Sequence, residues 1–254
     1  MNMNDKKYLI IGGGGLLGST LISALIESNA NVIAVDRDLP HMENTLSSLG
    51  ITLSPDKIEL RSIDVTDESQ ISSLFKDLGH LDGVVNCSYP KNKNYGASFF
   101  QVSLENFNEN VSLHLGSAFL IMRESAAYFE RRKHPFSLVN IGSIYGSCAP
   151  DFRIYNDTDM TTPVEYAAIK SAIIHLNKYV ATYVSNSNFR VNSVSPGGLL
   201  ANQPKSFLDL YKSKTLGRGM LMPEDVIGSI LFLLSDASSY INGQDLLVDD
   251  GFSL

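Results

Sequence analysis

Tryptophan is absent from this 254-residue sequence, and cysteine occurs only twice, at Cys87 and Cys148. Two cysteines far apart in the chain do not form a disulfide framework or a zinc site, so we expect no metal and a reducing, cytoplasmic setting. No stretch approaches the roughly 18 to 20 apolar residues that span a bilayer. The polar residues 1–7 precede only a short apolar run before glycines begin, so neither a membrane span nor a signal peptide is predicted.

Positive charge is also scarce. The formal net charge is −7, with 20 Lys and Arg against 27 Asp and Glu, and no basic run extends beyond Arg131, Arg132 and Lys133. Binding along a nucleic-acid backbone depends on neutralising many phosphates. We therefore do not expect nucleic acid as a partner.

Short β-branched runs alternate with helix-length amphipathic segments, a pattern typical of an α/β fold whose parallel sheet is covered by helices on both faces. We predict one domain over residues 1–254, because no repeat, low-complexity tract or Pro/Ser-rich linker divides the chain. Seven strands are expected, at residues 8–11, 31–35, 57–63, 82–87, 136–141, 190–194 and 246–248. Helices are expected at residues 16–28, 67–78, 104–132, 163–185 and 223–235.

Two segments between these elements, residues 89–97 and 149–162, are rich in Asn, Asp, Pro and Thr. They are too polar for core, and we expect them to form loops at one rim of the sheet. They are candidates for substrate contact.

A glycine-rich turn joins the first expected strand to the first helix, in the order Gly12-Gly13-Gly14-Gly15-Leu16-Leu17-Gly18. Glycines permit a tight turn and let backbone N–H groups at a helix N-terminus approach a pyrophosphate. An ordinary strand-to-helix turn has the same appearance. The following strand favours a dinucleotide site, because it ends in Asp36, about 20 residues after the glycines, where a carboxylate can bind an adenine ribose.

Asp36 would repel a 2′-phosphate, so NAD(H) is the predicted cofactor. The neighbouring Arg37 keeps NADP(H) open, because a guanidinium can hold that phosphate. Short side chains also follow the third and fourth strands, at Asp64-Val65 and Asn86-Cys87-Ser88. Open α/β sheets bind ligands at the carboxyl ends of their strands, so these residues are expected along the same crevice.

Tyr166 and Lys170 lie four residues apart in the expected helix 163–185, and hence on one helix face. A phenol near pKa 10 exchanges protons poorly at neutral pH, whereas a neighbouring cation lowers its pKa by roughly one to three units. We predict that Lys170, aided by a positively charged nicotinamide, tunes Tyr166 as a general acid/base. Ser143 follows the fifth strand, where it is either a turn residue or the group that orients the substrate oxygen toward Tyr166.

The order and spacing of these motifs resemble the short-chain dehydrogenase/reductase family over essentially the whole chain. The matching pieces are the glycine turn, Asp36, Asp64-Val65, Asn86, Ser143, Tyr166/Lys170, Pro196-Gly197 and the tail from Pro223 to Gly251. The resemblance implies a Rossmann-like doubly wound sheet and hydride transfer between NAD(P) and a secondary alcohol or ketone. It also implies a homotetramer or homodimer packed through the helices 104–132 and 163–185.

The resemblance further implies Tyr166 as acid/base, Lys170 on the nicotinamide ribose, Ser143 on the reacting oxygen, and Pro196, Gly197 and Leu199 near the carboxamide. The expected cofactor contacts are Gly12, Gly15, Leu17, Gly18, Asp36, Arg37, Asp64, Val65, Asn86, Cys87, Ser88, Tyr166, Lys170, Pro196, Gly197 and Leu199.

The chain also departs from the family pattern. Leu16 stands where the shorter members have a middle glycine, and the run 86–89 keeps only the first residue of the usual Asn-Asn-Ala-Gly. The relay Asn of the family aligns with His114 or Asn110, and His114 is either a proton relay beneath Lys170 or a hydrogen-bonded core histidine. Ser143 and Tyr166 are 23 residues apart, more than is usual. The added polar segment, expected to overhang the site, includes Asp151, Arg153, Tyr155, Asn156, Asp157 and Thr158.

Within the family, residues 89–96, 163–170 and 195–198 resemble oxidoreductases tied to flagellin modification and bacterial nonulosonic-sugar synthesis. Together with the polar rim, this implies a small polar substrate, a sugar or sugar phosphate, whose phosphate Lys91, Lys93 or Arg153 could bind. Two alternatives stay open. A 3-oxoacyl reductase would have an apolar tunnel, and a non-catalytic dinucleotide sensor would usually lack the Tyr or the Lys.

Overall fold

A computed structural model describes residues 2–156 and 158–254; Met1 and Asp157, the latter one of the residues expected over the site, lie outside the described residues. In the described part, parallel strands form a seven-stranded sheet in the order β3-β2-β1-β4-β5-β6-β7. The seven predicted strands are confirmed, with ends that differ by at most two residues. Their bounds are β1 Lys7–Ile11, β2 Asn31–Asp36, β3 Ile58–Ser62, β4 Gly83–Asn86, β5 Phe136–Ile141, β6 Phe189–Pro196 and β7 Asp245–Val248.

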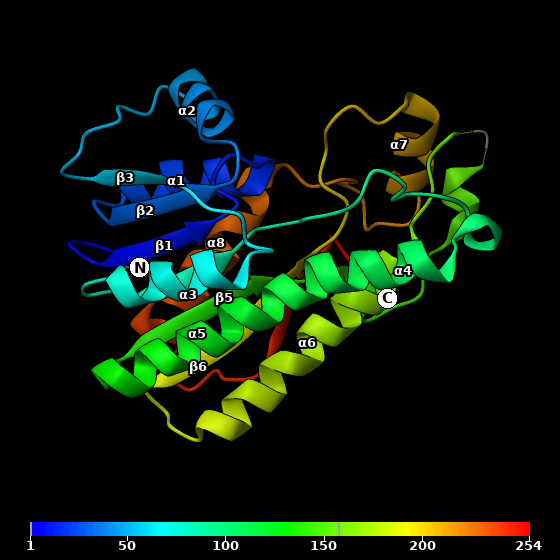
Figure 1. Cartoon of the computed structure of the whole chain (residues 1–254). Helices are drawn as coiled ribbons and strands as arrows, with labels where there is room; N and C mark the ends of the chain where they lie inside the picture. Colours follow the sequence, from blue (N-terminus) through cyan, green and yellow to red (C-terminus); the bar gives the residue numbers. More distant parts are fainter. Residues whose placement is uncertain (1, 157) are drawn as a thin grey trace.

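Helices cover both faces of the sheet, as Figure 1 shows. The two cores form because successive strand residues point to opposite faces: Tyr8 and Ile10 of β1 enter one core, and Leu9 and Ile11 enter the other. The first core is closed by α1 (Leu16–Glu27), α2 (Leu39–Ser48) and α8 (Pro223–Leu234). The second is closed by α3 (Glu68–Asp77), α5 (Gly116–Arg132) and α6 (Val164–Val184). This arrangement confirms the predicted doubly wound α/β fold.

The expected helix 104–132 is interrupted. It consists of α4 (Leu104–Asn110), a π-helical turn η2 (Val111–Leu115) and α5. Sequence periodicity did not reveal the π turn, because one wider turn inside a helix changes the hydrophobic spacing only locally. The turn carries His114 and buries it.

Two short helices were not predicted. α2 has only Met42 and Leu46 buried, and α7 (Lys205–Lys212) only Phe207 and Tyr211. So few apolar anchors give weak helical periodicity. The remaining short turns are the 3-10 helices η1 (Phe99–Gln101), η3 (Ile144–Gly146), η4 (Phe152–Tyr155) and η5 (Asp236–Ser238).

The polar segment 149–162 is not purely a surface loop, as the sequence had suggested. It contains η4, whose Ile154 is 1% exposed and packs with Phe207 and Tyr211 of α7. Ile154, with the partly buried Tyr155 and Met160, anchors the segment once α7 supplies a partner surface. The segment 89–97 contains no helix or strand, as predicted.

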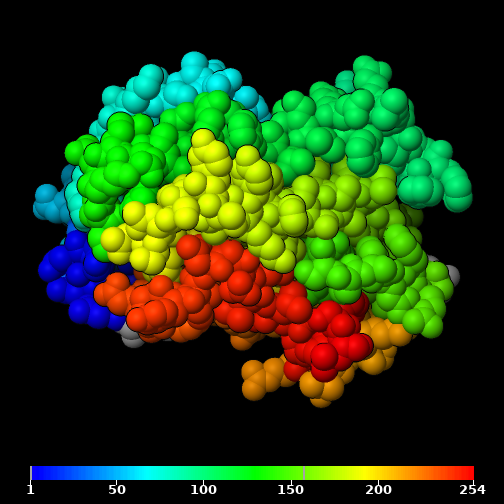
Figure 2. Space-filling model, turned by 90° about the horizontal axis from the view of Figure 1, so that it is seen from below, coloured from blue at the N-terminus to red at the C-terminus, as the bar shows by residue number. Residues whose placement is uncertain are grey.

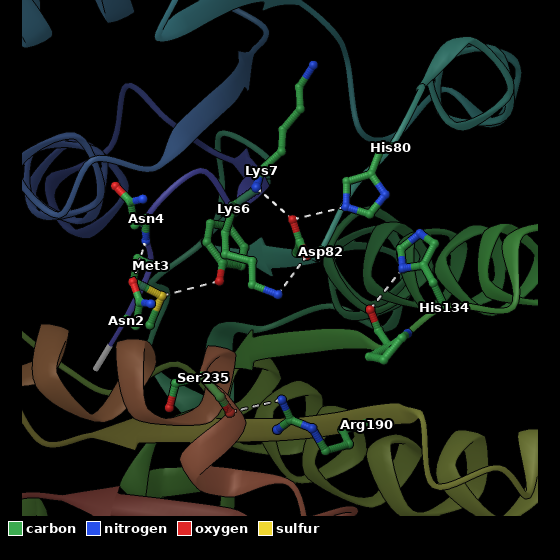
Figure 3. Close-up of polar contacts among 12 residues, drawn as sticks. Asn2, Met3, Asn4, Lys6, Lys7, His80, Asp82, His134, Arg190 and Ser235 are labelled. Carbon is green, nitrogen blue, oxygen red and sulfur yellow. Dashed lines mark hydrogen bonds and ion pairs between the residues drawn. The ribbon is translucent and has the colours of Figure 1, made fainter.

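Polar contacts hold the amino ends of the strands together, away from the rim where the motifs gather (Figure 3). Asp82 accepts hydrogen bonds from the Lys7 backbone N–H (2.8 Å) and the Lys6 ammonium (3.2 Å), and its carboxylate lies 3.3 Å from His80 Nε2. The buried Arg190 guanidinium donates to carbonyls that include those of Leu233 and Ser235. These contacts fasten β1 to β4 and β6 to the end of α8. None of the described helices is long and apolar enough to cross a membrane.

Candidate active site

At two positions of the glycine turn, neighbouring backbone atoms lie too close for any residue other than glycine. Gly12 has φ +80°, and a Cβ there would lie 2.9 Å from the backbone carbon of Cys87. A Cβ on Gly18 would lie 2.1 Å from the Gly12 carbonyl oxygen. The turn therefore presses β1 against both β4 and α1, and the backbone at the start of α1 stays accessible to a phosphate.

Asp36 ends β2 beside this turn, and its Oδ2 accepts a hydrogen bond from the Gly14 N–H at 3.0 Å. A Cβ on Gly14 would lie 3.1 Å from that oxygen, so a larger residue there would require the carboxylate to shift by a few tenths of an ångström. Next to it is a cavity of about 270 Å³. Its lining includes Gly12, Gly15, Asp36, Arg37, Asp64, Val65, Cys87 and Ser88. These residues fit the adenosine half of a dinucleotide.

A second cavity, of about 620 Å³, lies at the carboxyl ends of β4, β5 and β6. Gly15, Cys87, Ser88 and Tyr89 line both cavities, which gives a dinucleotide one path through the two. The predicted residues in the second lining are Gly15, Leu17, Gly18, Cys87, Ser88, Ser143, Tyr166, Lys170, Pro196, Gly197 and Leu199.

Asn86 and His114 are predicted site residues that line neither cavity. Asn86 is buried at the end of β4, where its Oδ1 accepts hydrogen bonds from the Ser88 N–H (3.1 Å) and hydroxyl (2.7 Å). Its amide donates to Asn140 Oδ1 at 3.3 Å. Asn86 therefore stabilises the turn that follows β4.

Tyr166 and Lys170 share one face of α6, as their spacing predicts: the Lys170 ammonium lies 5.7 Å from the centre of the Tyr166 ring. Lys170 is only 4% exposed and donates to the Ile141 carbonyl at 2.7 Å. Burial lowers the pKa of Lys170 to about 8. It thus stays largely cationic at neutral pH, although it is nearly enclosed.

In the protein by itself, the pKa of Tyr166 is raised rather than lowered. Burial is the larger influence, and hydrogen bonding from Ser143 opposes it. Ser143 is buried after β5 and caps η3, where its Oγ accepts from the Tyr145 N–H at 3.2 Å. The expected lowering of the phenol pKa by Lys170 is therefore not reached in the free protein. The cost of burying a phenolate exceeds the opposing effect of the hydrogen bond with Ser143.

His114 lies beside Tyr89, a residue of the second cavity. Its ring packs edge-on against Tyr89 at 4.9 Å, and the charge of Lys170 helps to lower its pKa. Burial is the larger cause and lowers that pKa to about 2, so the ring is neutral. Its buried Nδ1 has no partner among the described residues. The Asn110 amide instead joins Asn92 to Glu165.

Sequence reasoning did not single out several residues of the second cavity as site residues. They are Leu16, Ile141, Gly142, Ile144, Tyr145, Gly198, Gln203, Phe207, Tyr211 and Met220, whereas Tyr89, Tyr155, Met160 and Thr161 belong to the two segments expected to contact substrate. Four of them belong to α7 and its flanks, an element whose weak periodicity hid it. Tyr145 stands two residues after Ser143, and this proximity was the signal that could have found it.

The basic residues expected to bind a phosphate differ in their surroundings. Arg153 is held by both oxygens of Asp151, at 2.8 and 2.7 Å. Lys91 lines the first cavity, with its ammonium 5.4 Å from the centre of the Tyr89 ring and 5.6 Å from that of Tyr95. Lys93 lines neither cavity. Of the three, Lys91 is therefore the one placed to meet a ligand.

Known proteins resemble this chain along its whole length. A family model described as enoyl-(acyl carrier protein) reductase matches residues 17–253. The post-translational flagellin modification protein A of Campylobacter coli is 33% identical, with 99% of this chain and 100% of that protein covered. A 3-oxoacyl-acyl-carrier-protein reductase of Thermotoga maritima is 27% identical, with 99% of each covered.

Among solved structures, a short-chain dehydrogenase from Leptospira borgpetersenii serovar Hardjo-bovis with bound NAD+ superposes with a TM-score of 0.87. It is 33% identical and covers 100% of this chain and 94% of its own. The sheet order, the glycine turn beside Asp36 and the Ser143, Tyr166 and Lys170 group agree with these likenesses. The chain therefore belongs to the short-chain dehydrogenase/reductase family of NAD(P)-dependent oxidoreductases.

Proposed function

We propose that this protein is an NAD(H)-preferring oxidoreductase that acts on a hydroxyl or carbonyl of a carbohydrate, in the synthesis of sugars for flagellin or surface glycans. We also propose that it is cytoplasmic and folds as one domain over residues 1–254. One observation carries the proposal: Ser143, Tyr166 and Lys170 meet at a cavity of about 620 Å³ whose walls also include the hydroxyl-bearing Tyr145 and Tyr155. A sugar needs several such groups. The likeness to a flagellin modification protein supports the same substrate class.

The site residues divide the chemistry among themselves. When bound, the nicotinamide supplies or accepts the hydride. Ser143 orients the substrate oxygen, and Tyr166 gives that oxygen its proton in reduction or takes it in oxidation. Lys170 holds the nicotinamide ribose and, as a buried cation, favours the phenolate over the phenol. His114, neutral beneath Tyr89, remains a proposed proton relay.

Cofactor preference is tested by Asp36→Ala. Without the carboxylate, the protein loses the acceptor for the ribose hydroxyls, and the repulsion of a 2′-phosphate disappears while Arg37 stays. We expect the ratio of NADP(H) to NAD(H) affinity to rise about 10- to 100-fold, the equivalent of one or two charged hydrogen bonds. Fluorescence titration with NADH and NADPH measures it, with the exposed Asp56→Ala as control. Tighter NADPH binding by the unmodified protein would show that the ribose argument is wrong.

Reduction of 3-oxoacyl groups is the second candidate, favoured by the likeness to an acyl-carrier-protein reductase and by Leu199, Met220 and Phe207 in the cavity. The two candidate functions are distinguished by the rate of NADH consumption with 2-keto-myo-inositol, compared with that with acetoacetyl-CoA. A carbohydrate enzyme reduces the polyhydroxy ketone at least about tenfold more efficiently, because an apolar chain leaves the wall hydroxyls unpaired. Preference for the thioester would replace the carbohydrate proposal. No turnover of either would favour the dinucleotide sensor.

We also propose that the protein is a homodimer or homotetramer joined through α5 and α6, which lie side by side on the face shown in Figure 2. An apolar groove of about 760 Å³ runs between them. Its rim carries Phe119, Tyr179 and Tyr183, the last 78% exposed. A second copy would bury this surface. Light scattering should therefore give the wild type a molar mass that is a multiple of 27.8 kDa. The double variant Tyr179→Glu, Tyr183→Glu should give the mass of a single chain. A monomeric wild type would contradict the proposal.

A further inference from the structure

The segment that lengthens the distance between Ser143 and Tyr166 brings a third hydroxyl to the reacting pair. Tyr155 ends η4, and it lines the same cavity of about 620 Å³ as Ser143 and Tyr166. An insertion into the chain therefore forms part of the substrate wall.

Tyr155 is held on both its hydroxyl and its ring. The Tyr155 and Thr162 hydroxyls lie 2.6 Å apart, and the Tyr145 hydroxyl is 3.2 Å away from Tyr155 Oη. The ring packs against Phe207 of α7 at 5.2 Å between centres. Next to it in the chain, the buried Ile154 fastens η4 to α7. A side chain fixed in this way is a preorganised contact and loses little freedom when a ligand binds.

The hydroxyl of Tyr155 retains hydrogen-bonding capacity. The Tyr155 hydroxyl can both donate and accept, and its partners Thr162 and Tyr145 are hydroxyls that can do the same. A ligand oxygen in the cavity can therefore replace the Tyr145 hydroxyl, the more distant of the two partners, at Tyr155. Ser143 and Tyr166 both act on the reacting oxygen, so Tyr155 is available for a different oxygen of the substrate.

We propose that Tyr155 binds a second substrate oxygen on the carbon next to the reacting one, which makes the substrate an α-hydroxy ketone and the reduced product a vicinal diol. This inference rests on the proposed function and narrows its substrate class. The ketone carbon gains the hydride that converts NADH to NAD+, the ketone oxygen gains a proton from Tyr166, and the neighbouring hydroxyl is unchanged. Tyr155 lines the same cavity as Ser143 and Tyr166, so a substrate with two neighbouring oxygens can present one to Tyr155 and the other to the reacting pair.

The test compares cis-1,2-cyclohexanediol with cyclohexanol as ligands of the enzyme–NADH complex, in which no turnover occurs. The fluorescence of bound NADH reports binding of each alcohol. We expect the diol to bind the wild type about tenfold more tightly, the equivalent of one well-placed hydrogen bond. Tyr155→Phe should weaken diol binding by about 5- to 10-fold and leave cyclohexanol binding unchanged, because the ring still packs on Phe207.

Two further variants make the result specific. Thr162→Val removes an anchor of the Tyr155 hydroxyl and should reduce the diol preference in part. Tyr240→Phe, at a fully exposed tyrosine, should change nothing. Equal affinity of the wild type for the two alcohols, including no binding of either, would overturn the role of Tyr155, as would an undiminished diol preference in Tyr155→Phe. Failure to form the NADH complex would instead contradict the proposed function.

Discussion

Tyr166→Phe is expected to lower kcat for NADH-dependent carbonyl reduction by about 10²- to 10⁴-fold, the usual contribution of a positioned general acid. Phenylalanine keeps the ring and its packing, and removes only the hydroxyl that donates the proton. The loss should therefore appear in kcat, with little change in NADH affinity or thermal stability. Steady-state kinetics on the carbonyl substrate that the wild type reduces, beside an NADH titration, measures both.

The control is Tyr240→Phe, which removes a phenol hydroxyl from a fully exposed side chain outside the proposed interface. It should leave kcat unchanged. If Tyr166→Phe retains wild-type kcat, proton transfer by Tyr166 is excluded, and the chain retains only its dinucleotide-binding function.

Lys170→Met is expected to change activity and stability in opposite directions. Loss of the buried cation should reduce kcat/KM by about 10²-fold or more, because the cation favours the ionised form of Tyr166. Stability should rise by about 1 to 2 kcal/mol, since relief of an ammonium buried at a pKa of about 8 exceeds the loss of the bond to Ile141. A purely structural lysine would produce the reverse, with lost stability and retained activity.

The difference in stability between the wild type and Lys170→Met depends on pH in a definite direction. Burial lowers the pKa of Lys170, so between about pH 8 and its ordinary value of 10.5 the unfolded chain holds a proton that the folded chain has released. Wild-type stability therefore gains from this group as pH rises through that window. Denaturation of wild type and Lys170→Met should show the variant's advantage constant below pH 8 and shrinking above it. The wild-type rate of reduction should decline over the same rise.

The role of His114 is tested with His114→Leu in the same assays, because asparagine would restore the relay residue of the family. A relay would lose rate at little change in stability. A core histidine would lose stability, because leucine lacks the flat ring that packs edge-on against Tyr89, and its kcat would not change.

Much of the fold follows from local sequence. Buried strands such as β1, β2 and β4 form continuous apolar runs that the sequence shows directly. The short runs of β3 and β7 were located as well, although these strands are partly exposed. Motifs that depend on one turn or one helix face, such as Gly12 with Gly18 or Tyr166 with Lys170, were equally visible. By contrast, α7, the π turn and the burial of Ile154 were not predicted, because each depends on a surface supplied by a segment distant in the sequence.

The sequence by itself determined the parallel sheet, the rim at which its polar residues gather, and the pairing of a phenol with an ammonium, since all three depend on periodicities of two and 3.6 residues. Only the tertiary structure decided that Lys170 bonds to Ile141, that burial raises the pKa of Tyr166, and that Tyr145 lines the reacting cavity. Burial and neighbouring groups set these properties, and residues far apart in the chain become neighbours only when it folds.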